Sequence, residues 1–117
     1  MAGRYTLTIR KGPKVERERF DELGPALDAL EARLSPLEGR SLREAVDLRY
    51  REFTPVAQVA VRGEVSGPGR ILPAVHGGVD LRGDGSAEPY TGRVHRRVVE
   101  RRKGETAFAA LRRALTA

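Results

Sequence analysis

The sequence predicts an α+β fold: an antiparallel sheet of about five strands, with two helices on one face, in the order ββα-βββ-α. Apolar and polar residues alternate with a period of two near the N-terminus and again after residue 78, as in half-buried strands. Leucines recur at helical spacing between residues 23 and 34, and a second apolar stripe follows residue 104. A chain of 117 residues fits one core, so we expect residues 1–117 to form a single domain.

The N-terminal third is predicted to form two strands and a helix. Residues 5–9 alternate apolar and polar, and a Gly-Pro turn leads to a charged return strand over residues 15–20, typical of a sheet edge. The alternating Glu and Arg residues of that strand predict a solvated strand with cross-strand ion pairs. A helix then begins near Gly24-Pro25 and ends at Ser35-Pro36. Its buried stripe is predicted to contain Leu23, Leu27, Leu30 and Leu34.

The middle of the chain leaves one element open. Residues 41–44 match a capping box, which favours a helix, whereas alternation from Val46 to Tyr50 favours a strand. We prefer the strand over residues 41–53, because a second β-rich run at residues 56–61 continues it beyond Pro55. The Gly- and Pro-rich segment from Gly63 to Gly78 then predicts a long, mobile connection.

A β-hairpin is predicted around Asp84-Gly85. Residues 79–82 alternate, Asp-Gly suits a type I′ turn, and Tyr90–Val99 resumes an extended pattern. In that return strand Arg93, His95 and Arg97 share one face, and Arg101, Arg102 and Lys103 follow at once.

The last element is predicted to be a helix that begins after Gly104. Phe108, Leu111 and Leu115 form its buried stripe. Glu105 suits the positive N-terminal end of the helix dipole, and Arg112 and Arg113 suit the negative end.

The charge of the chain is concentrated near the C-terminus. The formal net charge is +6, and residues 93–117 carry all of it, since the first 92 residues balance. An asymmetry of this kind indicates a polyanionic partner. The alternative is that the preference for Arg, which supplies 19 of the 22 basic residues, reflects coding bias alone.

Catalytic and metal-binding patterns are weak. There is no cysteine. The chain has two histidines, His76 and His95, but no serine in the Gly-x-Ser-x-Gly pattern of a nucleophile elbow. Asp80 and Asp84 resemble part of a calcium loop, but Arg82 occupies a ligand position. We therefore expect no enzyme activity, no metal and no cofactor. Neither a signal peptide nor a run of about 18 apolar residues is present, so we expect a cytoplasmic protein without a membrane partner.

These observations favour a small non-catalytic domain that binds the backbone of a nucleic acid, DNA or RNA. Arginine suits phosphate contact. The sequence has no cluster of aromatic residues of the kind that stacks on unpaired bases. The predicted nucleic-acid-binding residues are Arg93, His95, Arg97, Arg101, Arg102 and Lys103.

An alternative function and a shared order of elements also have to be considered. The alternative function is a protein-interaction or homo-oligomerisation module that uses the sheet or its 15–20 edge. The element order after residue 20 is shared with double-stranded-RNA-binding domains, but their lysine-rich second-helix start is replaced here by Gly104-Glu105-Thr106-Ala107. We therefore assign no family.

Overall fold

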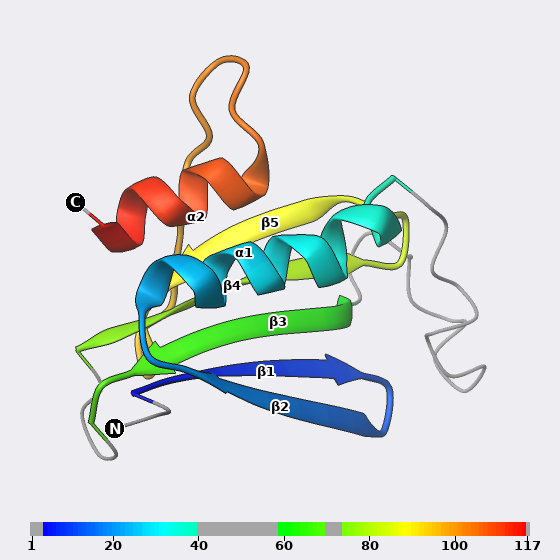
Figure 1. Cartoon of the computed structure of the whole chain (residues 1–117). Coiled ribbons are helices and arrows are strands. Elements are labelled where there is room, and N and C mark those ends of the chain that lie inside the picture. The colour runs from blue at the N-terminus through cyan, green and yellow to red at the C-terminus, as the bar shows by residue number, and fades with distance from the viewer. Residues whose placement is uncertain (1–3, 40–58, 70–73, 117) are drawn as a thin grey trace.

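The strands of the computed structural model form one antiparallel sheet, and both helices pack on one face of it (Figure 1). The structure describes residues 4–39, 59–69 and 74–116. The strand order is β2-β1-β3-β4-β5-β6. The predicted fold class is confirmed, with β6 as a short addition to the expected five strands. In chain order the elements are β1 (Tyr5–Lys11), β2 (Lys14–Phe20), α1 (Leu23–Leu34), the 3-10 turn η1 (Ser35–Leu37), β3 (Val59–Gly67), β4 (Val75–Arg82), β5 (Ala87–Thr91), β6 (Arg97–Val98) and α2 (Ala107–Thr116).

β1 and β2 form the predicted N-terminal hairpin, and β2 is the edge of the sheet. The alternation in β1 places Leu7 and Ile9 in the core, while β2 is exposed along nearly its whole length. α1 crosses from β2 to β3, which pairs with β1 and not with β2. The hairpin is therefore tied to the rest of the sheet through β1 alone.

The predicted leucine stripe of α1 is confirmed. Leu27, Leu30 and Leu34 are buried, and Leu23 packs partly buried against the same core. Ser35 and Pro36 end the α-helix and continue as η1. One cluster of buried residues joins this stripe to the strands and to α2, whose Phe108 and Leu111 are also buried. Burial of each large aliphatic side chain stabilises the fold by about 1.5–3 kcal/mol.

The predicted mobile connection from Gly63 to Gly78 is wrong, because most of it is strand. β3 extends to Gly67 and β4 begins at Val75. Gly63 is not a turn residue here: a Cβ on it would lie 3.0 Å from Leu34 Cδ2 and 3.2 Å from Ile9 Cδ1. A side chain at this position would therefore require Leu34 of α1 and Ile9 of β1 to move by a few tenths of an ångström. The undecided segment 41–53 and residues 56–58 lie outside the described residues, whereas residues 59–61 of the predicted run belong to β3.

The hairpin at Asp84-Gly85 is confirmed, but its turn is of another type. The amide of Gly85 donates to the carbonyl of Arg82 (2.8 Å), and Gly85 has φ 89°. Asp84 has no positive φ, unlike a type I′ turn, and its Oδ1 accepts from both the amide and the hydroxyl of Ser86. A three-residue loop ending in a left-handed glycine therefore joins β4 to β5.

The return strand predicted over Tyr90–Val99 is also wrong. β5 ends at Thr91, the chain reverses over residues 92–96, and β6 pairs antiparallel with β5. Gly92 makes this reversal feasible, because it takes φ 93° and a Cβ there would lie 2.3 Å from the carbonyl oxygen of His95. A glycine within a strand pattern was the available signal.

Candidate nucleic-acid interface

The six residues predicted to bind nucleic acid lie in what we call the basic arm, residues 92–106, between β5 and α2. All six are exposed. The arm stands at the edge of the sheet opposite β2, and its loop over residues 99–106 projects beyond α2 (Figure 1, orange).

The structure does not place Arg93, His95 and Arg97 on one strand face. Arg93 and His95 belong to the reversal, and only Arg97 is in a strand, opposite Thr91. The shared-face prediction depended on an unbroken strand, which the turn at Gly92 removes. Arg101, Arg102 and Lys103 follow in the loop, as the sequence order requires.

The start of the basic arm is attached to β4. The amide of Gly92 donates to the carbonyl of His76 (2.9 Å), and Nδ1 of His76 donates to the carbonyl of Gly92 (3.1 Å). The amide of Val99 donates to the carbonyl of Pro89 (2.9 Å). These bonds fix both ends of the reversal on the sheet. His76, expected in a loop, is a half-buried residue of β4.

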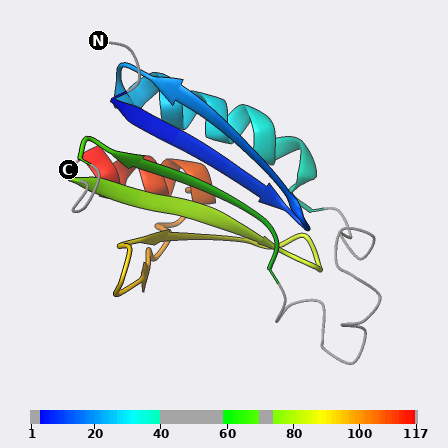
Figure 2. The ribbon, with the colours of Figure 1, turned by 90° about the horizontal axis from the view of Figure 1, so that it is seen from below.

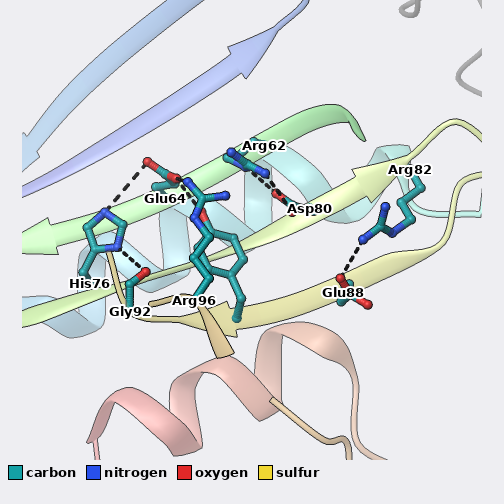
Figure 3. Close-up of polar contacts among 9 residues, drawn as sticks. Arg62, Glu64, His76, Asp80, Arg82, Glu88, Gly92 and Arg96 are labelled. Carbon is teal, nitrogen blue, oxygen red and sulfur yellow. Dashed lines mark hydrogen bonds and ion pairs between the residues drawn. The ribbon is translucent and has the colours of Figure 1, made fainter. Parts of the chain in front are cut away.

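Arg96 holds the reversal against the sheet from the side opposite the helices (Figure 3). Its guanidinium carbon lies 4.8 Å from the ring centre of Tyr90, and its Nη2 lies 3.1 Å from Oε1 of Glu64. The hydroxyl of Tyr90 donates to the same Oε1 (2.5 Å). Tyr90 is 3% exposed, and burial together with the bond to Glu64 raises the pKa of its phenol. Arg96 is thus part of the structure of the arm.

The far end of the arm is held by Arg113 of α2. Its guanidinium donates to both carboxylate oxygens of Glu105 (2.8 and 2.9 Å) and to the carbonyl of Glu100 (2.9 Å). Glu105 Oε1 also accepts from the amide of Arg102 (2.9 Å). The bond from Arg113, followed by that from Arg102, lowers the pKa of Glu105 to about 2. These two charges pair with each other, whereas the sequence predicted that each would serve the helix dipole.

Six of the eight Arg and Lys residues of the C-terminal region fall into two groups. Arg96, Arg112 and Arg113 each pair with a carboxylate, that of Glu64, Asp28 and Glu105 respectively. Within residues 4–39, 59–69 and 74–116, no ion pair is formed by Arg97, Arg101 or Lys103. The second group is the part of the predicted site that is available to a ligand.

The sheet face away from the helices carries a second set of arginines. Arg62 forms a bidentate ion pair with Asp80 (2.6 and 3.0 Å), and Asp80 is only 6% exposed. Arg82 pairs with Glu88 (2.7 Å) (Figure 3). Arg10, Arg17 and Arg19 share this face and are exposed. Sequence reasoning treated the charges of β2 as ion-paired and so missed them. The period of two was the available signal, because it puts like charges of an alternating run on one face.

The described residues also bear on three other kinds of feature: a metal site, a pocket and a membrane-spanning helix. Among the described residues, no group of three or more His, Cys, Asp and Glu side chains is placed to hold a metal ion. A shallow groove of about 530 Å³ lies beside β5, with Glu88 and Pro89 on one side and Val99 and Arg101 on the other. In the same part of the chain, no helix is long and apolar enough to cross a membrane.

Comparison of the chain with protein-family models, with curated proteins and with solved structures found no match. The arrangement of the side chains is therefore the basis on which a function can be assigned.

Proposed function

We propose that this protein is a small, non-catalytic domain that binds the phosphate backbone of a nucleic acid through its basic arm. The observation that carries the proposal is the clamp formed by Arg113. It binds Glu105 and the carbonyl of Glu100, the residues on either side of Arg101, Arg102 and Lys103. The carboxylate of Glu105 is thus already paired with Arg113, and the three cations themselves are exposed.

A loop held in this way loses less conformational freedom on binding than a free chain would. Arginine also offers a planar set of donors that matches two phosphate oxygens. Tyr90 is covered by Arg62 and Arg96, whose guanidinium carbons lie 5.6 and 4.8 Å from its ring centre, so it is not open to a base. The arrangement favours contact with phosphates over recognition of bases.

Salt dependence of binding is the test. We suggest fluorescence anisotropy with a labelled duplex DNA and a labelled duplex RNA over a range of salt concentrations. Each phosphate contact contributes about −0.9 to the slope of log affinity against log salt on duplex DNA. The variant R101Q/K103Q should therefore bind more weakly, with a slope about 1.8 less steep than that of the unmodified protein.

The matched control is R33Q/R112Q, which also removes two positive charges but from helices α1 and α2. Both arginines already pair with carboxylates, Arg33 with Glu16 and Arg112 with Asp28. We expect this control to keep most of the slope. The proposal is rejected if the unmodified protein binds neither duplex in a salt-dependent manner, or if the control loses as much slope as R101Q/K103Q.

A further inference from the structure

The β2 edge separates its charges by face. Glu16 and Glu18 lie opposite Ile9 and Leu7 of β1, on the side of the helices. There Arg33 of α1 pairs with Glu16 (2.7 Å) and approaches Glu18 (4.0 Å). The expected cross-strand ion pairs with β1 are thus wrong, because the residues opposite the two glutamates are apolar.

The arginines of β2 lie on the other face of the sheet. Arg17 lies opposite Thr8 and Arg19 lies opposite Thr6, so neither faces a carboxylate across the strand pair. Since residues two apart on a strand are separated by about 6.8 Å, the two guanidinium groups start from neighbouring positions on one surface.

Arg10 of β1 extends the same surface. It lies opposite Val15 on one side and Arg62 on the other, and Arg62 is already bound to Asp80. No ion pair is formed by Arg10, Arg17 or Arg19 within the described parts of the chain. We call these three residues the open-face arginines. No described helix covers them, since both helices are on the opposite face (Figures 1 and 2).

A solvated edge strand needs charge to discourage pairing with other chains, and this role alone accounts for charged residues on β2. It does not require that like charges be collected on one face. Among the described residues these three arginines bind no carboxylate, although Glu64 lies on the same face beyond Thr8 and is itself bound to Arg96. Their mutual repulsion is a cost that a bound polyanion would relieve. The forked donors of arginine fit phosphate oxygens.

We infer that the open-face arginines form a second contact surface for a nucleic-acid backbone, at the edge of the sheet opposite the basic arm. The inference rests on the proposed function and adds a separate site to it. With five spacings of about 4.8 Å between β2 and β6, the two surfaces are separated by roughly 24 Å, so one domain contacts two separate phosphate segments. Phosphates are the ligand, because among the described residues of this face no uncovered aromatic ring lies beside the three arginines.

The test compares R17Q/R19Q with R101Q/K103Q and R33Q/R112Q in the same duplex assay. Each variant lowers the formal net charge from +6 to +4, so a general effect of charge would be equal in all three. We expect R17Q/R19Q to reduce the slope by about 1.8, and the loss to add to that of R101Q/K103Q because the sites are far apart. R17K/R19K should keep the slope, since it keeps the charge. Urea unfolding of each variant checks that the fold is intact.

The outcomes separate this inference from the proposed function. If R101Q/K103Q loses slope while R17Q/R19Q behaves like R33Q/R112Q, the open face is not a binding surface and the basic arm remains one. If the unmodified protein shows no salt-dependent binding, both proposals fail. If R17Q/R19Q loses slope and R17K/R19K does not, the second surface is supported.

Discussion

The two edges of the sheet use arginine in opposite ways. Towards the β5–β6 edge, Arg96 and Arg62, the latter from the interior strand β3, lie against Tyr90 and bind the carboxylates of Glu64 and Asp80. At the β2 edge, Arg17 and Arg19 point away from the helices and face threonines. Arginine near one edge therefore contributes to the structure, whereas arginine at the other is available to a ligand. A count of basic residues treats the two as equal, but the positions of the carboxylates distinguish them.

The largest expected effect comes from the same substitution at Arg62, in the interior strand β3, and at Arg17, in the edge strand β2. Arg62→Ala leaves the carboxylate of Asp80 buried without a counter-charge, which should lower the free energy of unfolding by about 3 kcal/mol. Arg17→Ala should change it by no more than about 0.5 kcal/mol, because the side chain is exposed. Urea denaturation measures both values. Equal effects of the two substitutions would refute the distinction between arginines that bind a carboxylate and the open-face arginines.

A smaller effect is expected from Tyr90→Phe. The substitution removes the hydroxyl that donates to Glu64 but keeps the ring under Arg96, so we expect a loss of about 1.5 kcal/mol. The basic arm should also become more accessible to trypsin, because its anchor is weaker. Tyr5→Phe, in β1, is the matched control. Unchanged cleavage of the arm in Tyr90→Phe would show that the hydroxyl of Tyr90 is not needed for Arg96 to hold it.

The clamp at the far end of the arm predicts a dependence on acid. Because the pKa of Glu105 falls from an ordinary value of 4.5 to about 2 in the folded protein, its pair with Arg113 stabilises the fold above about pH 4.5. That contribution is lost as the pH falls from there towards 2. The variant E105Q should therefore lose less stability than the unmodified protein between pH 5 and pH 3, by urea denaturation. Parallel curves for the two proteins would exclude the clamp.

The smallest expected effect concerns self-association, because we expect the unmodified protein to associate little through its β2 edge. In a symmetric antiparallel dimer that extends the sheet across β2 with its two-fold axis at Arg17, the middle of the strand, Glu16 and Glu18 would meet each other and Arg17 would meet its own copy. We therefore expect a monomer by light scattering, against the alternative hypothesis of an oligomer formed through this edge. R17T/E18T removes the central repulsions and should associate more strongly at high concentration. A dimer of the unmodified protein that R17T/E18T leaves unchanged would point to a different interface.

Local patterns were sufficient for much of the fold. The alternation in β1, the leucine stripe of α1 and the stripe of α2 each predicted an element, because a buried face requires apolar residues at the spacing of its own secondary structure. The Asp84-Gly85 turn was also predictable in its position. These features depend on neighbours within a few residues along the chain.

Glycines were the residues that local patterns misjudged. Gly63 indicated a loop but lies in the middle of β3, where a side chain would press against Leu34 of α1. Gly92 was read as part of a strand but ends it, because the carbonyl of His95 returns close to its Cα. Both roles depend on contacts with another element or a reversed chain, and the residue type alone does not reveal them.

By itself, the sequence determined the fold class, the edge position of β2, and the presence of excess cations between β5 and α2. Only the tertiary structure decided which cations are paired: Arg113 reaches back to Glu105 and Glu100, and Arg33 of α1 binds the glutamates of β2. The physical reason is that an ion pair needs two groups within about 4 Å, and for Arg33 and Glu16, 17 residues apart, the packing of helix on sheet sets that distance.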